Sequence, residues 1–128
     1  MNDAGRSRLL VIDDESDFAG FVRDFAERSG FEVATAENGE IAQRRFREFS
    51  PDIIVLDVVM PHVDGIEFID WLAAEGANVR LIVVTGFNPN YGQLAERLAV
   101  ARGLSSVTVL TKPVRVATLL KALRGEAG

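Results

Sequence analysis

Three carboxylates, one hydroxyl and one ammonium each follow an apolar run of strand length in this sequence. Asp13 and Asp14 follow residues 9–12, Asp57 follows 53–56, Thr85 follows 81–84, and Lys112 follows 107–111. The carboxyl ends of parallel strands lie along one edge of a sheet, and ligands bind in the crevice there. We therefore expect these side chains to meet, as a phosphoryl-accepting carboxylate with its metal ligands and charge-neutralising partners.

Asp13, Asp14 and Asp57 would repel one another at such an edge, by roughly a few kcal/mol per close pair at an effective dielectric constant of about 20. Without a cation, the pKa of at least one of these carboxyls should rise. A Mg²⁺ ion bound by one or two carboxylates, a backbone carbonyl and waters is the usual resolution. Any single aspartate could instead cap a helix or end a strand, but the expected convergence of all three favours a metal site.

Lys112 can neutralise the charge that develops on a phosphoryl oxygen during transfer. The hydroxyl of Thr85 can donate a hydrogen bond to the same group. Taken singly, each residue has an ordinary interpretation, as a solvated lysine and as a threonine that ends a strand. Their common position at strand ends favours phosphoryl binding.

Strand-like and helix-like segments alternate along the chain. The strands are predicted at 8–13, 32–36, 53–57, 80–85 and 107–111, and the helices at 16–29, 38–49, 65–75, 91–102 and 115–124. Near-continuous Val, Ile and Leu strands indicate burial on both faces. Strict alternation then implies a parallel sheet with helices on both sides. We predict a doubly wound α/β fold in one domain, residues 1–128, with an ordered core at about 8–124.

Local signals support these boundaries. Three glycines fall just after predicted helices, where a left-handed residue is favoured: Gly30, Gly76 and Gly103. Ser16 is predicted to cap the first helix. Phe18, Phe21 and Phe25 recur at helical spacing, and we expect them to face the core.

The composition is that of an ordinary globular protein, with 48% apolar and 26% charged residues. The net charge of −5 argues against a nucleic-acid-binding surface, which usually shows a basic stripe. The absence of cysteine excludes a disulfide framework and a thiolate metal site. No apolar core of a signal peptide follows Met1, and no apolar run approaches the about 20 residues of a membrane span. We expect a cytoplasmic protein that binds neither nucleic acid nor membrane.

Four segments together resemble the receiver domain of two-component response regulators, including the chemotaxis-regulator type: 11–15 (VIDDE), 56–65 (LDVVMPHVDG), 84–86 (VTG) and 110–113 (LTKP). The resemblance implies a flavodoxin-like five-stranded sheet of order 2-1-3-4-5. It also implies a role for each site residue: Asp57 as phospho-acceptor and Mg²⁺ ligand, Asp14 as direct Mg²⁺ ligand, Asp13 as ligand through water, Val59 as ligand through its backbone carbonyl, Thr85 as switch hydroxyl, and Lys112 as phosphoryl-binding lysine.

The resemblance further implies a Mg²⁺-dependent signalling switch. Such a domain takes a phosphoryl group from a sensor histidine kinase or a histidine phosphotransfer protein. It then changes conformation to control a downstream protein or a fused output domain. A phosphorylation-dependent dimer is a further implied assembly, and no turnover of an external substrate is expected, so the chain is not predicted to be an enzyme.

Three other classes of function stay open at this point. A Mg²⁺-dependent aspartyl phosphohydrolase would need a second aspartate as general acid where this chain has Val59. A phosphorylation-independent interaction scaffold would not need the intact set of Asp14, Asp57, Thr85 and Lys112. A flavin carrier would need a Ser/Thr-rich phosphate loop after the first strand, which this chain lacks.

The chain also departs from the family pattern. Val109 stands where members commonly carry an aromatic residue that moves with the threonine, and Thr85 and Lys112 lie 27 positions apart (112 − 85), several more than usual. We hypothesise that the loop at 86–91 replaces the aromatic relay, through the ring of Phe87 or Tyr91. The alternative is a longer loop that only covers the sheet edge.

A third departure concerns water. Val59 and Phe87 are apolar at positions that resemble those lining the path of an attacking water. Apolar side chains cannot orient water by hydrogen bonding, which predicts a slow loss of the phosphoryl group.

Overall fold

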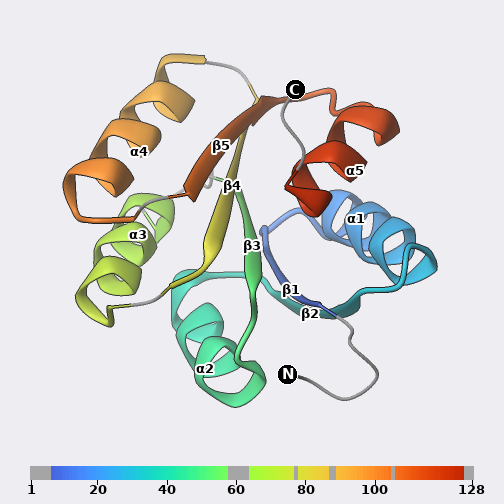
Figure 1. Cartoon of the computed structure of the whole chain (residues 1–128), viewed down its shortest axis with the longest axis horizontal. Helices are drawn as coiled ribbons and strands as arrows, with labels where there is room; N and C mark the ends of the chain where they lie inside the picture. The colour runs from blue at the N-terminus through green and yellow to red at the C-terminus, as the bar shows by residue number, and fades with distance from the viewer. Residues whose placement is uncertain (1–6, 58–63, 77, 87–88, 105, 126–128) are drawn as a thin grey trace.

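The computed structural model describes residues 7–57, 64–76, 78–86, 89–104 and 106–125. These residues form five strands and five helices in strict alternation (Figure 1). The strands are β1 (Arg8–Ile12), β2 (Glu32–Ala36), β3 (Ile53–Asp57), β4 (Arg80–Thr85) and β5 (Ser106–Thr111). The helices are α1 (Ser16–Arg28), α2 (Gly39–Phe49), α3 (Asp64–Ala74), α4 (Pro89–Ala101) and α5 (Val116–Arg124).

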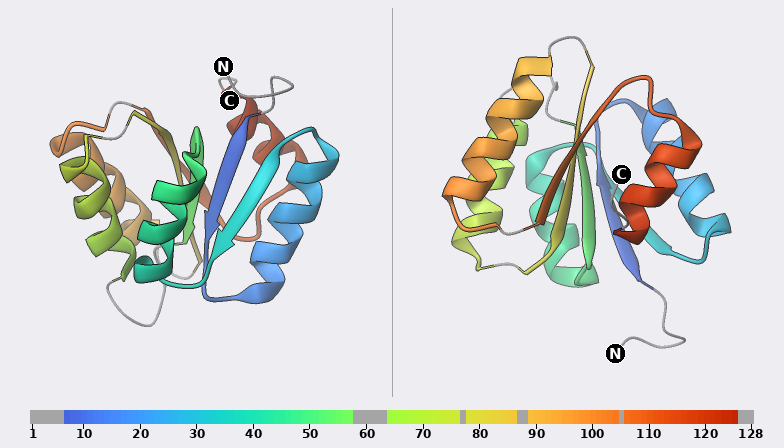
Figure 2. Two further views of the ribbon diagram at one scale, coloured as in Figure 1. Left: turned by 90° about the horizontal axis from the view of Figure 1, so that it is seen from below. Right: turned by 45° about the horizontal axis from the view of Figure 1, so that its top comes forward.

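All strand pairs in the sheet are parallel, and the strand order is β2-β1-β3-β4-β5. Helices α1 and α5 cover one face of the sheet, and α2, α3 and α4 cover the other (Figures 1 and 2). This is the flavodoxin-like doubly wound arrangement that the sequence predicted. The predicted bounds of every strand and helix agree with the structure to within two residues.

The strands are apolar throughout because each face of the sheet has its own core. Along β1 and β3, Leu10 and Ile54 pack with α2, α3 and α4, while Leu9 and Ile53 pack with α1 and α5. The alternation follows from the two-residue period of a strand. Burial on both faces holds the strands in register, and that register decides where their polar ends lie.

The predicted N-cap of α1 needs correction. Glu15, not Ser16, is the N-cap residue of α1, and its side chain makes no capping hydrogen bond. Instead Oδ1 of Asp13, the residue that follows β1, accepts a hydrogen bond from the backbone N–H of Glu15 at 2.8 Å. This bond stabilises the turn that leads into the helix.

The three glycines after the helices have positive φ as predicted: Gly30 (96°), Gly76 (70°) and Gly103 (102°).

The phenylalanine stripe of α1 lies in the core only in part: Phe18 and Phe25 are half-buried and pack against it, whereas the prediction is wrong for Phe21. The buried residues of this helix are Ala19, Val22 and Ala26, while Phe21 is 38% exposed. The small residues let α1 lie close to the sheet, so the larger rings are displaced to the flank of the helix.

None of the helices in the described part of the chain has the length and hydrophobicity that a membrane span needs.

Candidate functional site

Backbone pairing places the predicted site residues at one edge of the sheet. Asp57 is the last residue of β3 and lies beside Val84 of β4. Asp13 follows β1, and its N–H donates a 3.0 Å hydrogen bond to the carbonyl of Ala36. On the other side of the site, the N–H of Lys112 donates to the carbonyl of Thr85 at 2.8 Å. Each polar residue is thus held by a neighbouring strand end.

Three carboxylates meet at this edge. Oxygen atoms of Asp13, Asp14 and Asp57 all lie within 4.8 Å of one another. Asp13 and Asp57 are buried, each with 4% of its surface exposed, while Asp14 is exposed. The predicted convergence of the three aspartates is therefore a feature of the structure.

Asp13 carries the clearest electrostatic consequence of this crowding. Burial raises the pKa of its carboxyl to about 7, and the neighbouring Asp57 carboxylate adds to the rise, against the hydrogen bond from the Glu15 backbone. Oδ2 of Asp13 is buried and accepts no hydrogen bond from the residues that the structure describes. A cation bound beside Asp13 would lower the pKa of its carboxyl and give its Oδ2 a partner.

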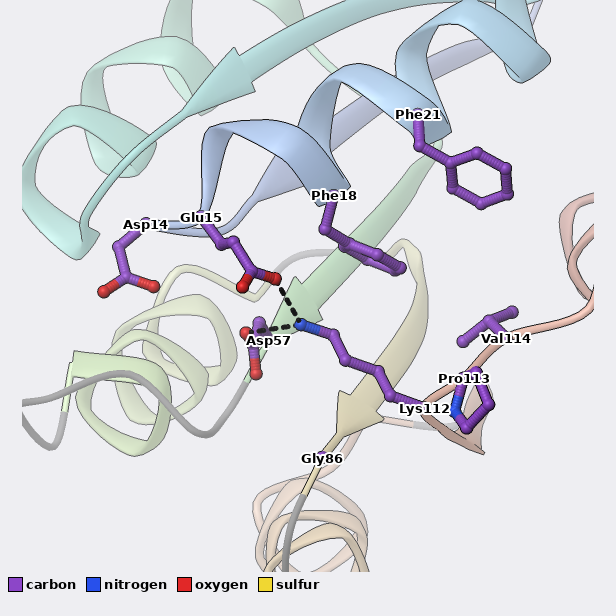
Figure 3. Close-up of a pocket in the computed structure, with 9 residues that line it drawn as sticks. All are labelled: Asp14, Glu15, Phe18, Phe21, Asp57, Gly86, Lys112, Pro113 and Val114. Atoms are coloured by element: carbon purple, nitrogen blue, oxygen red, sulfur yellow. Dashed lines mark hydrogen bonds and ion pairs between the residues drawn. The ribbon is translucent and has the colours of Figure 1, made fainter.

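In the described part of the chain, Lys112 is the basic residue that forms ion pairs with Asp13 and Asp57. Its Nζ lies 3.3 Å from Oδ2 of Asp57 and 3.3 Å from Oε1 of Glu15 (Figure 3). The same atom lies 3.6 Å from Oδ2 of Asp13. The Nζ also lies 4.4 Å from the ring centroid of Phe18. Burial disfavours the charged ammonium, but the Asp13 and Asp57 carboxylates outweigh it, and the pKa of Lys112 is raised. The side chain is therefore a charged ammonium held against Asp57.

The donor set fits a hard cation. Mg²⁺ prefers oxygen ligands and is bound through one or two carboxylates with waters. The buried Oδ2 of Asp13, which accepts no hydrogen bond from the described residues, and the clustered oxygens of Asp14 and Asp57 are ligands of that kind. Val59, the predicted backbone ligand, lies outside the described residues, as does Phe87, so the prediction of slow dephosphorylation stays a prediction.

Thr85 is fully buried at the end of β4, where it was predicted. In the register of the sheet it lies beside Thr111, the residue before Lys112. The predicted hydroxyl and ammonium therefore come from adjacent strands. The loop hypothesis remains untested, because residues 87–88 lie outside the described residues and the side chain of Tyr91 is not described.

Sequence reasoning missed two contacts of Lys112. Glu15 and Phe18 both contact its ammonium, and both project from the start of α1. Their spacing of three residues is one helical turn, so helical periodicity counted from Asp14 could have placed them on the face above the site. Phe18 packs against the core in part, as predicted, but the prediction gave it no further contact with Lys112.

A cavity of about 610 Å³ opens over these residues. Its charged lining comes from the two sides of the site: Asp14, Glu15, Asp57 and Lys112. Asp57 and Lys112 therefore face a space large enough for a small ligand. The remaining wall is formed by Gly86 after β4 and by apolar residues of α1 and of the segment after β5.

Known proteins are similar to this chain in sequence and in fold. The family profile of the response regulator receiver domain matches residues 9–124. Chemotaxis protein CheY of Listeria monocytogenes is 31% identical over 121 residues, which cover 94% of this chain and 98% of that protein. The alkaline phosphatase synthesis transcriptional regulatory protein PhoP of Bacillus subtilis is 33% identical over 87 residues, 68% of this chain.

The match to PhoP spans only 36% of that longer protein. Among solved structures, a response regulator receiver domain protein from Clostridium thermocellum superposes with a TM-score of 0.80 at 27% identity, covering 93% of this chain and 92% of that one. The strand order, the acidic cluster beside a lysine and these similarities agree. This chain belongs to the family of response regulator receiver domains.

Proposed function

We propose that Asp57 is the phospho-acceptor of this receiver domain and that Lys112 binds the phosphoryl group. The donor is a phosphohistidine on a sensor histidine kinase or on a histidine phosphotransfer protein. The observation that supports the assignment best is the position of Asp57. It is a buried carboxylate 3.3 Å from a lysine ammonium and part of a cluster with Asp13 and Asp14.

The chemistry is the transfer of a phosphoryl group from a histidine nitrogen to a carboxylate oxygen. An Oδ atom of Asp57 attacks the phosphorus, the bond from phosphorus to the histidine nitrogen breaks, and its electron pair stays on that nitrogen. Positioning and charge stabilisation supply most of the catalysis in such transfers. The Lys112 ammonium already lies 3.3 Å from the attacking carboxylate. It can pair with the phosphoryl oxygens as their negative charge grows.

The acidic cluster would hold Mg²⁺ through Asp14 and Asp57 directly and through Asp13 by way of water, with Val59 as a backbone ligand. Bound Mg²⁺ supplies positive charge that offsets repulsion between the carboxylates and the phosphoryl oxygens. Asp13 also has a structural role, because its Oδ1 accepts a hydrogen bond from the backbone N–H of Glu15 and so stabilises the turn before α1.

Phosphorylation would then act as a switch. The mixed anhydride on Asp57 is high in energy, and part of that free energy can shift a conformational equilibrium. Thr85 would donate its hydroxyl to the phosphoryl group and change its contacts at the end of β4. The changed surface would control a downstream protein, a fused output domain or a dimer of receiver domains. Residues 1–128 would act as one such domain, without turnover of external substrates.

Phosphorylation by acetyl phosphate tests the assignment. Intact-mass spectrometry should detect one added phosphoryl group with Mg²⁺ and none with EDTA. Asp57→Asn should abolish the addition, whereas Asp24→Asn, a matched change at an exposed aspartate of α1, should retain it. Full modification of Asp57→Asn, or modification that ignores EDTA, would refute the proposed phospho-acceptor.

A further inference from the structure

The cavity above Asp57 has two chemically different ends. One end holds the charged groups of the proposed phosphorylation site. The other end is lined by four apolar residues: Phe18, Phe21, Pro113 and Val114. Figure 3 shows the Lys112 side chain running between the two ends, with its ammonium toward Asp57 and the rings of Phe18 and Phe21 on the far side from Asp14.

The apolar end is built by two separate segments. Phe18 and Phe21 lie on one face of α1, with ring centroids 6.1 Å apart and planes tilted by 41°. Pro113 and Val114 follow Lys112 between β5 and α5, and they line the cavity together with these rings. An apolar wall from these two segments therefore starts beside the ammonium that is proposed to bind the phosphoryl group.

This wall is only partly buried, although Phe18 and Val114 also pack against the core on the α1 and α5 side of the sheet. Phe21 is 38% exposed, although it is one of the largest apolar side chains, and Phe18 is half-buried. Small-molecule sites are concave and mostly apolar, with a few placed polar groups, and they span roughly 300–1,000 Å³. The cavity of about 610 Å³ has this size and composition.

We propose that the cavity binds small acyl phosphates with an apolar acyl group and that this chain accepts phosphoryl groups from them in preference to acetyl phosphate. The proposal rests on the proposed function of Asp57 and names the donor class of the same site. The charged end fits the phosphate and the apolar end fits the acyl group, so an amphiphilic anion fits the cavity as a whole. The acetyl group is too short to cover the rings of both Phe18 and Phe21.

The transfer is balanced without a further reactant. An Oδ atom of Asp57 attacks the phosphorus of the acyl phosphate, and the bond from phosphorus to the bridging oxygen breaks. The electron pair stays on that oxygen, which leaves as a carboxylate. One acyl phosphate is exchanged for another, because Asp57 ends as an aspartyl phosphate. The carboxylate product keeps its apolar group against Phe18 and Phe21 until it dissociates.

A comparison of three donors tests the proposal. Acetyl, butyryl and benzoyl phosphate are supplied at equal, sub-saturating concentration with Mg²⁺, and the rate of phosphorylation of Asp57 is followed by intact-mass spectrometry. Each rate is divided by the rate at which the same donor phosphorylates a Phe18→Ser, Phe21→Ser double variant, which corrects for intrinsic reactivity. Burial of two further methylene groups is expected to favour butyryl over acetyl phosphate by roughly tenfold.

Single variants locate the effect. Phe21→Ser should lower the butyryl-to-acetyl ratio several-fold, and because this side chain is partly exposed the fold should tolerate the change. Leu94→Ser is the matched control: Leu94 is a 55% exposed residue of α4 outside the cavity lining, and its change should leave the ratio as in the parent. Circular dichroism and thermal unfolding verify that each variant is folded.

The outcomes separate this proposal from the one on which it rests. If none of the donors modifies Asp57, the proposed phospho-acceptor itself is wrong. If acetyl phosphate modifies Asp57 and the corrected ratio is near one, only the acyl-group site is refuted. A ratio that falls equally in Phe21→Ser and Leu94→Ser would also refute it, because the preference would then not arise in the cavity.

Discussion

A Cβ atom added to Gly92 of α4 would lie 2.8 Å from Cγ1 of Val109 on β5. The same atom would lie 3.0 Å from Cγ2 of Thr85. The backbone of α4 thus rests directly on the end of β4 and on the residue that replaces the usual aromatic. A glycine on the helix and a short side chain on the strand together allow this close approach. Any displacement of Thr85 would therefore be transmitted to α4 by direct contact.

Gly92→Ala should destabilise the protein. Alanine gains about 1 kcal/mol over glycine in helix propensity, but overpacking a closed contact costs about 1–3 kcal/mol. We expect a net loss of roughly 1 kcal/mol in the free energy of unfolding, measured by urea denaturation. Gly20→Ala in α1 is the control: nothing lies within 4 Å of its added Cβ, so it should stabilise the protein. A Gly92→Ala variant at least as stable as the parent would contradict the close contact.

The Gly92 contact also marks a limit of prediction from sequence. Strict alternation of apolar runs and helical patterns was enough for the fold, because burial on both faces leaves each strand little freedom. Convergence of Asp13, Asp57 and Lys112 followed from that fold. The close approach of α4 did not follow from the fold. It depends on how closely the helix packs against Val109 and Thr85, and no periodicity in the sequence encodes that distance.

The same limit applies to α1. Its helical spacing was read correctly, but the rotation of the helix was not. Ala19 and Val22 are buried against the sheet, Phe18 packs against this core only in part, and Phe21 is exposed. Hydrophobicity alone assigns the largest rings to the core, whereas packing distance favours small residues at the closest contact. The rings displaced in this way reach Lys112 and the cavity, which is why the apolar wall of the site was missed.

Asp57→Asn should stabilise the metal-free fold. The change removes one of three negative charges that lie within 4.8 Å of one another. Lys112 keeps Asp13 and Glu15 as ionic partners, so its charge stays compensated. We expect a gain of about 1 kcal/mol in EDTA, measured by urea denaturation.

Added Mg²⁺ should raise the melting temperature of the parent more than that of Asp57→Asn, because a ligand bound only by the native state stabilises it by mass action. Asp24→Asn, at an exposed position, serves as the control and should respond to Mg²⁺ as the parent does. Equal shifts in the parent and Asp57→Asn would show that the carboxylates do not share a cation.

Glu15→Gln should accelerate phosphorylation. The exposed Glu15 carboxylate lies 3.3 Å from the Lys112 ammonium, so it competes with an incoming phosphoryl group and repels its negative charge. An exposed ion pair contributes less than about 1 kcal/mol, so we expect a rate roughly threefold higher with acetyl phosphate and Mg²⁺. Glu27→Gln, an exposed change on the same helix, should keep the parent rate. A slower Glu15→Gln would mean that Glu15 orients Lys112 rather than competes for it.

Arg80 connects the first residue of β4 to the end of α5. Its guanidinium donates to the carbonyl of Leu123 at 3.0 Å and to the carbonyl of Ala122. These carbonyls lie in the last turn of the helix, where a positive charge is favoured. The Ala122 carbonyl also accepts a 3.1 Å hydrogen bond from the N–H of Gly125. Arg80→Met keeps the apolar stem and should cost about 1–2 kcal/mol of stability.

Hydrogen exchange should report this loss locally, with faster exchange of amides in 119–124. Arg102→Met removes an exposed ion pair of 3.1 Å with Asp70 and should cost less than about 1 kcal/mol, with no change of exchange in α5. Equal losses in the two variants would show that the carbonyl contacts of Arg80 add nothing beyond its surface charge.

The last prediction concerns the transmission of phosphorylation to α4. Binding of beryllofluoride at Asp57, as a phosphoryl mimic, should draw the Thr85 hydroxyl toward it, because a charge-assisted hydrogen bond forms there. The Cγ2 methyl of Thr85 would then leave its contact with Gly92. Amide chemical shifts should change at residues 86 and 90–95 as well as at 57 and 64–65. Changes confined to 57 and 64–65 would exclude α4 as the responding element.

Thr85→Ser separates the two roles of this side chain. Serine keeps the hydroxyl that binds the phosphoryl mimic but lacks the methyl that contacts Gly92. The chemical-shift changes at 90–95 should therefore shrink in Thr85→Ser relative to those at 64–65. If they keep the size seen in the parent, the signal does not pass through the methyl contact, and the loop at 86–91 becomes the remaining candidate for the responding element. Thr85→Ala, which lacks both groups, should lose the response in α4 altogether.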